Sequence, residues 1–217
     1  MSNQAEPRSG GGKRRYHTPK RTARAQATRQ RIRTAAETLF LRDGYARATM
    51  SAVAQAAGVA EKTVYLAFPT KADLLNEIIV TALRAEDAPR PFRTRLREAL
   101  MAPPEQLVAE FAALSADMMT WTARVMALGE SGASSDPQLA ELRDRGHAAM
   151  RSDCRNVAAA LAARGALAED LTTDVAASTL YAIVNESVYL RLVDGCGWTP
   201  DEYRAWLDRT LTTTLLR

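Results

Sequence analysis

Apolar residues follow a helical period from about Ala25 onward. One helical face, at positions i, i+3, i+4, i+7 and i+8, is filled by Ile32, Ala35, Ala36, Leu39 and Phe40. Arginines occupy much of the remaining surface, and Asp43-Gly44 supplies the glycine that commonly ends a helix. The pattern predicts an amphipathic helix over residues 25–43.

Two much shorter apolar runs follow, and Gly58 joins them. Thr49 offers an N-cap for the first run, which spans barely two turns and ends at the glycine. The second is predicted to run from Glu61 to Ala67, before Pro69, with Val64 turned inward. Three side chains then remain on its outer face: Lys62, Thr63 and Tyr65.

Helices this short need a neighbour, because isolated helices below about 12 residues are marginally stable in water. The 25–43 helix is the nearest one. Thr70 and Asp73 form a Ser/Thr-x-x-Asp/Glu capping pattern that opens a further helix. Three helices with a glycine-containing turn between the last two make a helix-turn-helix, whose second helix fits the major groove of DNA.

The remaining chain shows no strand pattern, and residues 76–217 are predicted to form about six helices. Breaks are expected at 86–91, 102–104, 129–137, 163–170 and 194–200, where Pro, Gly or charged residues gather. The predicted fold class is all-α, with an N-terminal three-helix helix-turn-helix domain over 25–71 and a larger C-terminal helical domain over 72–217.

The last two helices are expected over about 172–193 and 200–216. Thr199 is the predicted N-cap of the final helix, with Pro200 in its first turn and Glu202 completing a capping box. Trp198 is placed to pack on Tyr203 across the helix start.

Charge is divided unevenly along the chain. Residues 1–71 hold 14 Lys+Arg against 4 Asp+Glu, whereas residues 72–217 hold 15 against 21, so the formal net charge changes from +10 to −6. A basic N-terminal third favours a polyanionic partner such as DNA. Residues 1–24 read as a disordered basic arm that either stays solvated or reaches DNA. The excess of basic over acidic residues continues beyond this arm to Lys71, and a solvated tail alone does not explain it.

The segment from Arg29 to Leu75 resembles the DNA-binding part of the TetR/AcrR family of bacterial repressors. The resemblance lies in "AAETLF" followed by "GY", in "VAQAAGV", and in "TVY" followed by "FPTKADLL". The sequence departs from the family pattern at Ala60, where members often carry a capping serine; the alanine costs the next helix about 1 kcal/mol. It departs also at Leu66-Ala67, where members often carry His-Tyr, which implies fewer phosphate contacts.

The resemblance implies roles for five residues of this segment. Thr49 and Lys71 match phosphate-contacting positions, and Thr63 and Tyr65 match DNA-contacting positions of the recognition helix. Lys62 is the best candidate for contacting a base edge, because lysine pairs with guanine acceptors in the major groove. For Tyr65 the alternative is a ring that packs beneath the motif.

Two stretches suggest a ligand pocket in the C-terminal domain. The first is rich in methionine and holds Phe111, Met118 and Trp121, which would form an adaptable lining or, alternatively, an ordinary core. The second places Tyr181 and Asn185 within an otherwise apolar helix. A buried amide there needs a partner, either a ligand or a second subunit.

Dimerisation is expected because one helix-turn-helix contacts only a few base pairs. A two-fold dimer places two recognition helices about 34–36 Å apart on a pseudo-palindromic operator. The last two helices are the predicted interface, which would involve Leu180, Val184, Glu186, Leu207 and Leu211.

Other function classes find little support. The chain has no G-x-S-x-G, H-E-x-x-H or Walker pattern, so an enzyme is not predicted. Two cysteines and two histidines do not supply the ligand clusters of a structural metal site, and no cofactor is expected. No run approaches the about 18 apolar residues of a membrane span, so a cytoplasmic location without membrane contact is expected.

The predicted function is a homodimeric repressor that binds double-stranded DNA and is released by a small apolar or amphipathic ligand. The alternative is a constitutive or architectural DNA-binding protein without an inducer. A helical protein-interaction module with an incidental basic tail is a further alternative.

Overall fold

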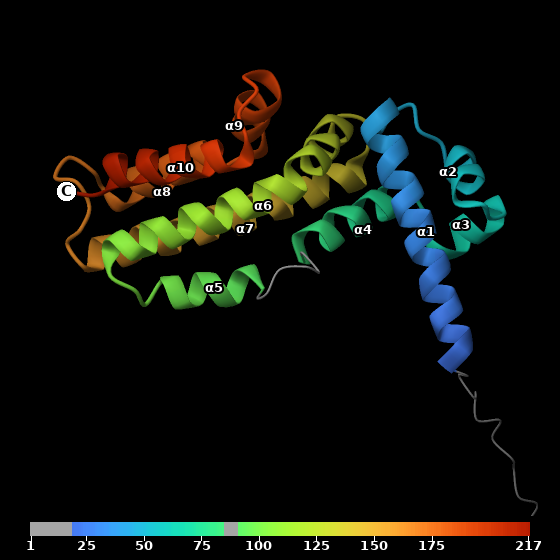
Figure 1. Cartoon of the computed structure of the whole chain (residues 1–217), viewed down its shortest axis with the longest axis horizontal. Helices are drawn as coiled ribbons and strands as arrows, with labels where there is room; N and C mark the ends of the chain where they lie inside the picture. The colour runs from blue at the N-terminus through green and yellow to red at the C-terminus, as the bar shows by residue number, and fades with distance from the viewer. Residues whose placement is uncertain (1–18, 85–90) are drawn as a thin grey trace, which may run out of the picture.

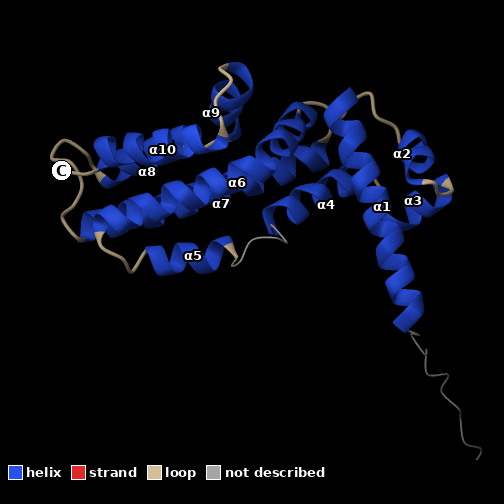
Figure 2. Ribbon diagram, in the orientation of Figure 1, coloured by secondary structure: helices blue, strands red, loops and turns tan. Residues whose placement is uncertain are grey.

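The computed structural model describes residues 19–84 and 91–217, and this part of the chain is built from helices without strands (Figure 1, Figure 2). The predicted all-α fold class is therefore confirmed. None of the described helices is both long and apolar enough to cross a membrane. The helices are α1 (Pro19–Asp43), α2 (Met50–Ala57), α3 (Glu61–Ala67), α4 (Lys71–Arg84), α5 (Phe92–Ala99), α6 (Pro104–Ala133), α7 (Pro137–Ala163), α8 (Thr173–Ile183), α9 (Glu186–Leu190) and α10 (Pro200–Leu215).

The helices form a small N-terminal unit and a larger C-terminal domain (Figure 1). In the N-terminal unit α2 lies beside the long helix α1 and packs on α3, and α4 leads toward the larger domain. Leu74 and Leu75 of α4 are fully buried in the same core as Ile32 and Val53. The predicted boundary after residue 71 thus falls at the first residue of a helix that the N-terminal core requires, and the N-terminal unit extends through α4.

Helix α1 begins earlier than the sequence pattern predicted. It starts at Pro19, six residues before Ala25, so residues 19–24 are helical and not part of a disordered arm. These extra residues lack an apolar period, which is why the pattern missed them. Lysine, arginine and alanine nevertheless have high helix propensity, and proline is favoured in the first turn. Residues 1–18 lie outside the described residues.

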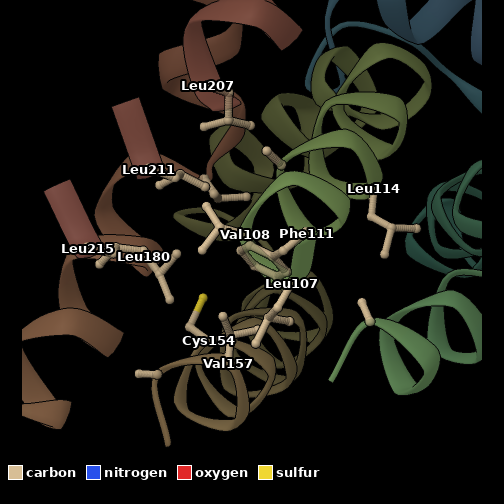
Figure 3. Packing of buried hydrophobic residues seen from close by; sticks show 14 of the residues in the cluster. Leu107, Val108, Phe111, Leu114, Cys154, Val157, Leu180, Leu207, Leu211 and Leu215 are labelled. Carbon is tan, nitrogen blue, oxygen red and sulfur yellow. The ribbon is translucent and has the colours of Figure 1, made fainter. Parts of the chain in front are cut away.

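The C-terminal domain is organised around the long helices α6 and α7, which pack side by side (Figure 1). Helices α5 and α10 pack on α6, and α8 packs on α7. Their inward faces form one apolar core, and full burial of a leucine contributes about 1.5–3 kcal/mol. Figure 3 shows its centre, which includes Leu107, Val108, Phe111, Cys154, Val157, Leu180, Leu207, Leu211 and Leu215.

The helix predicted over about 172–193 is interrupted. Val184 ends α8, Asn185 takes an extended conformation, and α9 begins at Glu186. The Asn185 side chain accepts a hydrogen bond from the Val188 backbone N–H at 3.0 Å and donates one to the Ala182 carbonyl at 2.7 Å. Asparagine is among the best N-capping residues, so it stabilises the break instead of a continuous helix.

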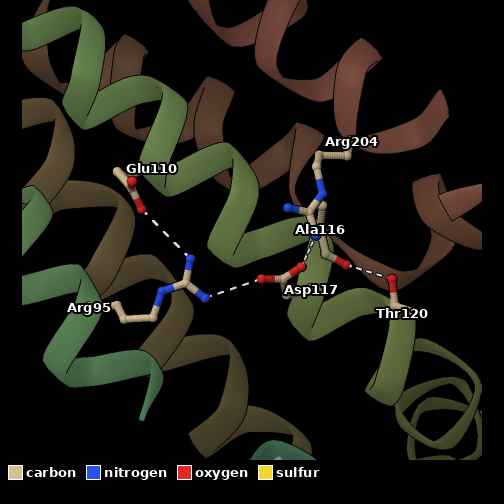
Figure 4. A network of polar contacts seen from close by, with 6 residues as sticks. All are labelled: Arg95, Glu110, Ala116, Asp117, Thr120 and Arg204. Atoms are coloured by element: carbon tan, nitrogen blue, oxygen red, sulfur yellow. Dashed lines mark hydrogen bonds and ion pairs between the residues drawn. The ribbon is translucent and has the colours of Figure 1, made fainter. Parts of the chain in front are cut away.

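A part-buried carboxylate ties three elements of this domain together (Figure 4). Asp117 of α6 accepts hydrogen bonds from Arg95 of α5, at 3.2 Å, and from Arg204 of α10. Arg95 also faces Glu110 at 3.7 Å. Asp117 therefore holds helices on two sides of α6.

The start of α10 follows the sequence prediction in its caps but not in its aromatic contact. The capping box of Thr199 and Glu202 is present in both directions. Trp198, however, stacks edge-on against Trp206, with ring centroids 6.1 Å apart, and the Tyr203 ring lies 5.8 Å from Trp206. Trp206 therefore lies in ring contact with both of the side chains that were expected to pack on each other.

Candidate nucleic-acid interface and ligand cavity

One side of α3 is buried in the N-terminal core, and the opposite side is exposed. Val64 and the following Phe68 are 0% and 1% exposed and fix α3 to the N-terminal core. Tyr65 is 47% exposed, Lys62 is exposed and Thr63 is half-buried. The predicted outward orientation of Lys62 and Tyr65 is therefore present, and the alternative of a Tyr65 ring packed beneath the motif is excluded.

The turn between α2 and α3 follows the local signals of the sequence. Thr49 caps α2, its hydroxyl oxygen accepting from the Ala52 N–H at 3.1 Å. The hydroxyl proton remains as a donor for an external acceptor such as a phosphate oxygen. Gly58 has φ of 63°, the left-handed conformation that favours glycine. Ala60 precedes α3 without a side-chain cap, as its methyl group requires.

Arg29 of α1 bonds to other residues of the N-terminal unit, so its charge is not free to contact DNA. Its guanidinium donates to the Ala67 carbonyl at 2.6 Å, which satisfies the end of α3. It also pairs with Glu77 of α4 at 3.1 Å and lies 4.0 Å above the Phe68 ring. One arginine thus fixes α3 between α1 and α4.

Lys71 was predicted to contact phosphate, and the structure places its ammonium elsewhere. The three ammonium donors are directed at the carbonyls of Tyr45, Ala46 and Ala48, at 2.8, 3.4 and 3.1 Å. The nitrogen also lies 4.3 Å from the centroid of the Tyr45 ring. Burial lowers the pKa of Lys71, and the charge of Asp136 acts in the opposite direction. The side chain holds the loop before Thr49, and a phosphate contact by its charge stays a prediction that would require these bonds to break.

The same loop is bonded to the C-terminal domain. The buried Tyr45 phenol donates to Asp136, at the turn between α6 and α7, at 2.8 Å. Burial and this hydrogen bond raise the pKa of Tyr45. Gln138, in the first turn of α7, bonds Asp73 at 2.6 Å and Thr70 at 3.1 Å, both at the start of α4. We call these contacts the α6–α7 latch.

A partly open cavity of about 810 Å³ lies between α4 and the helices α5 to α9. This lies within the range of about 300–1,000 Å³ typical of small-molecule sites. Four methionines line it, which gives an adaptable apolar wall: Met118, Met119, Met126 and Met150. Val80 and Leu83 of α4 also line it, so the helix that completes the N-terminal core reaches the cavity at its other end.

The five residues predicted to bind a ligand divide into two groups. Met118, Tyr181 and Asn185 line the cavity. Phe111 is fully buried in the apolar core and Trp121 is 46% exposed, and neither lines the cavity. Both lie on α6 with Met118, and the helical period alone did not show which face turned toward the empty space.

The polar part of the cavity wall was largely missed by the sequence analysis. His147 lies 2.8 Å from Glu130, and its ring meets the Tyr181 ring edge-on at 6.1 Å. Asp153 of α7 is only 9% exposed, and among the described residues it has no hydrogen bond or ion pair. Nowhere in the described residues does a group of three or more His, Cys, Asp or Glu suited to a metal ion occur.

The apolar residues predicted for the dimer interface are not available for one, so this part of the prediction is wrong. The apolar members are at most 1% exposed within a single chain and belong to its own core: Leu180, Val184, Leu207 and Leu211. Figure 3 shows three of these leucines directed toward α6 and α7. Val184 and Glu186 line the cavity. An apolar period shows that a face is buried but not whether the neighbour is the same chain or a partner.

Comparison with known proteins agrees with this architecture. Residues 32–78, which cover most of α1–α4, match the family model of bacterial regulatory proteins of the tetR family. A search of curated protein sequences gives no match to the chain.

Solved structures with a similar fold cover almost the whole chain. NalD, the secondary repressor of the MexAB-OprM multidrug efflux pump in Pseudomonas aeruginosa, is 24% identical with a TM-score of 0.70, covering 90% of this chain and 98% of NalD. SmeT in complex with triclosan is 19% identical with a TM-score of 0.69, covering 88% and 93%. The ketosteroid transcriptional regulator KstR2 of Mycobacterium tuberculosis is 17% identical with a TM-score of 0.63, covering 87% and 95%.

At these identities the structural likenesses concern the fold, while the family match covers the helix-turn-helix itself. Residues 32–78 therefore match the tetR family model of bacterial regulatory proteins, and the fold of the chain is similar to those of NalD, SmeT and KstR2.

Proposed function

We propose that this chain is a homodimeric repressor that binds a pseudo-palindromic DNA operator through α2 and α3 and is released by a small amphipathic ligand in the cavity. The observation that carries the proposal is the outer face of α3. Lys62 and Tyr65 are exposed there, while Val64 and Arg29 fix the helix from behind. A short helix held in this way fits a major groove without rearrangement.

The α2 side of the interface adds contacts to the DNA backbone. Thr49 has a free hydroxyl donor at the start of α2, and Arg47 is exposed in the preceding loop. The internal bonds of Lys71 hold this loop in place, so Lys71 acts as a positioning residue here. Phosphate contacts of this kind set the orientation of the protein on the duplex and do not carry sequence information.

Dimerisation is proposed through the outward faces of α8 and α10. Val175 of α8 is 49% exposed, and Ser178 and Ala182 continue its stripe of small exposed residues. Val175→Lys should weaken self-association in sedimentation analysis while leaving the helical spectrum unchanged. Ser152→Lys, at an exposed site on α7, is the control and should remain dimeric.

Ligand release is supported by two connections between cavity and DNA-binding unit. Helix α4 lines the cavity with Val80 and Leu83, and its first turn carries Lys71 and Asp73. Helices α6 and α7 line the cavity in their middle, and the turn between them is bonded to Tyr45. A ligand that binds one arrangement of these helices better than another shifts the dimer between DNA-binding and non-binding forms.

The test is fluorescence anisotropy with a labelled duplex from the region upstream of the protein's own gene. Lys62→Ala and Tyr65→Ala should each weaken binding by about tenfold at fixed salt, since single groove contacts contribute about 1–3 kcal/mol. Arg97→Ala, which removes an exposed cation of α5, should leave binding unchanged. Equal affinity of both α3 variants and the parent chain would contradict the proposed interface.

A further inference from the structure

The cavity has an acidic wall whose charges are only partly compensated. Asp153, Glu130 and Glu186 contribute carboxylates to it, while Arg93 and His147 contribute the basic groups. Glu130 is paired with His147 at 2.8 Å. Asp153 and Glu186 have no ion pair or hydrogen bond with any residue in the described ranges. Two carboxylates of the cavity wall, those of Asp153 and Glu186, are thus without a bonded partner in the described part of the chain.

Asp153 is the informative member of this set. Asp153 is 9% exposed and lines the cavity. The charge of Arg93 acts on Asp153, but Arg93 is itself exposed and makes no ion pair with Asp153. An ionised carboxylate in an apolar wall is costly unless a partner supplies hydrogen bonds or positive charge.

The rest of the wall suits the apolar part of such a partner. The four cavity methionines adapt to irregular shapes, and Phe92 adds a flat apolar surface. The combination of a large apolar volume with a buried unpaired acid resembles the general composition of small-molecule sites, in which few polar groups fix the orientation.

We propose that the cavity ligand is a cationic amphiphile whose ammonium group is held by Asp153, with Glu186 adding to the negative potential and the methionines receiving the apolar body. This inference rests on the proposed function for the existence of a ligand and specifies the ligand's charge. It makes Asp153 a specificity-determining residue. An anionic amphiphile of the same length is disfavoured, because both unpaired groups repel it.

The test measures binding alone, by isothermal titration calorimetry with the full-length chain. Three probes share one alkyl chain and differ in the head group: dodecylammonium, dodecanol and dodecanoate, each below its micelle-forming concentration. Dodecylammonium should bind at least about tenfold more tightly than the other two, which corresponds to one hydrogen-bonded charged group. Asp153→Asn should remove this preference, and Asp144→Asn, at an exposed site on the same helix, should retain it.

The outcomes separate this inference from the proposed function. Equal binding of the three probes, tighter binding of dodecanoate, or no binding by any probe would overturn the inference. An unchanged preference in Asp153→Asn would overturn the role of Asp153. The helical spectrum and the melting curve of the variant serve as the control for folding. If dodecylammonium binds with the expected preference but leaves the operator complex intact, the ligand class stands and the proposed release mechanism fails.

Discussion

Both the N-terminal unit and the C-terminal domain contain charged side chains that tie elements together, but only the C-terminal domain leaves a buried carboxylate without a bonded partner in the described residues. In the N-terminal unit Arg29 and Lys71 are bonded to backbone carbonyls, so charges that look available for DNA serve to fix short helices and a loop. In the C-terminal domain the long helices are held by apolar packing, and Asp153 is buried beside a cavity without a bonded partner in residues 19–84 and 91–217.

The difference follows from helix length. Helices α2 and α3 are 8 and 7 residues long and bury few side chains each, so they depend on neighbours for their geometry. Helices α6 and α7 are 30 and 27 residues long, and they share a large apolar core beside the cavity. Charged side chains that are bonded within the protein therefore indicate a surface of fixed shape. A buried charge without a bonded partner indicates a binding site for a ligand.

The largest expected effect comes from removing the Lys71 ammonium. Lys71→Met keeps an apolar stem beside the Tyr45 ring and deletes three charge-assisted hydrogen bonds. We expect the free energy of unfolding to fall by about 2–3 kcal/mol. Lys62→Met, at an exposed site, should leave stability unchanged and reduce the salt dependence of DNA binding by about one phosphate contact. Urea unfolding and DNA titrations over a range of salt measure both.

The reverse result would remove the distinction drawn between these two lysines. If Lys71→Met unfolds at the same urea concentration as the parent chain and loses DNA affinity as Lys62→Met does, its charge acts on phosphate. The carbonyl bonds would then be a resting arrangement of the free protein.

The Asp117 bridge is the next test, since it measures how much a bonded charge contributes to the stability of the C-terminal domain. Asp117→Asn leaves two arginines without their shared partner and should lower the free energy of unfolding by about 1–2 kcal/mol. Glu110→Gln is the matched control, because its carboxylate faces Arg95 at 3.7 Å and its side chain is 47% exposed. The control should cost less than about 0.5 kcal/mol in the same urea titration. Equal losses in both variants would contradict the role of Asp117.

The sequence was most informative where structure is decided locally. Capping residues, glycine and proline predicted the helix ends between Thr49 and Asp73, and the helix ends of the structure agree closely with this prediction. The role of Lys71 was missed because its acceptors lie 23 to 26 positions earlier in the chain, beyond any local pattern.

The C-terminal domain shows the same limit on a larger scale. Its helices were predicted from periodicity, but periodicity does not identify the neighbour of an apolar face. Leu180 and Leu211 fit a dimer seam and a monomer core equally well as sequence, and the fold assigns them to the core. Asp153 carried no sequence signal of its own, because only the tertiary arrangement creates the cavity that it borders.

The α6–α7 latch joins the two parts, and Tyr45→Phe removes one of its bonds while keeping the ring. The loss of the hydrogen bond to Asp136 should cost about 1 kcal/mol of stability and reduce the change in DNA affinity that a bound ligand produces. Tyr203→Phe is the control, because the Tyr203 hydroxyl is buried and has no hydrogen-bond partner within the described residues. Its removal should leave stability equal or slightly higher. Unfolding curves and DNA titrations with and without dodecylammonium provide the readout.

The smallest effect concerns the pH dependence of stability that Asp153 introduces. Burial raises the pKa of this carboxyl in the folded chain, while the unfolded value is about 3.9. Between these two values the folded state holds more protons than the unfolded state, so the free energy of unfolding decreases as pH rises through that window. Asp153→Asn removes this decrease, whereas other titrating groups contribute equally to parent and variant.

The melting temperature of Asp153→Asn relative to the parent chain should therefore increase from about pH 4 upward and then level off, once the carboxyl is ionised in both states. Asp144→Asn, at an exposed site, should show no such trend. A difference that is constant from acid to neutral pH would mean that the Asp153 carboxylate is already neutralised within the fold. Asp153 would then be compensated within the fold, as Arg29 and Lys71 are in the N-terminal unit. The preference for a cationic ligand would lose its physical basis.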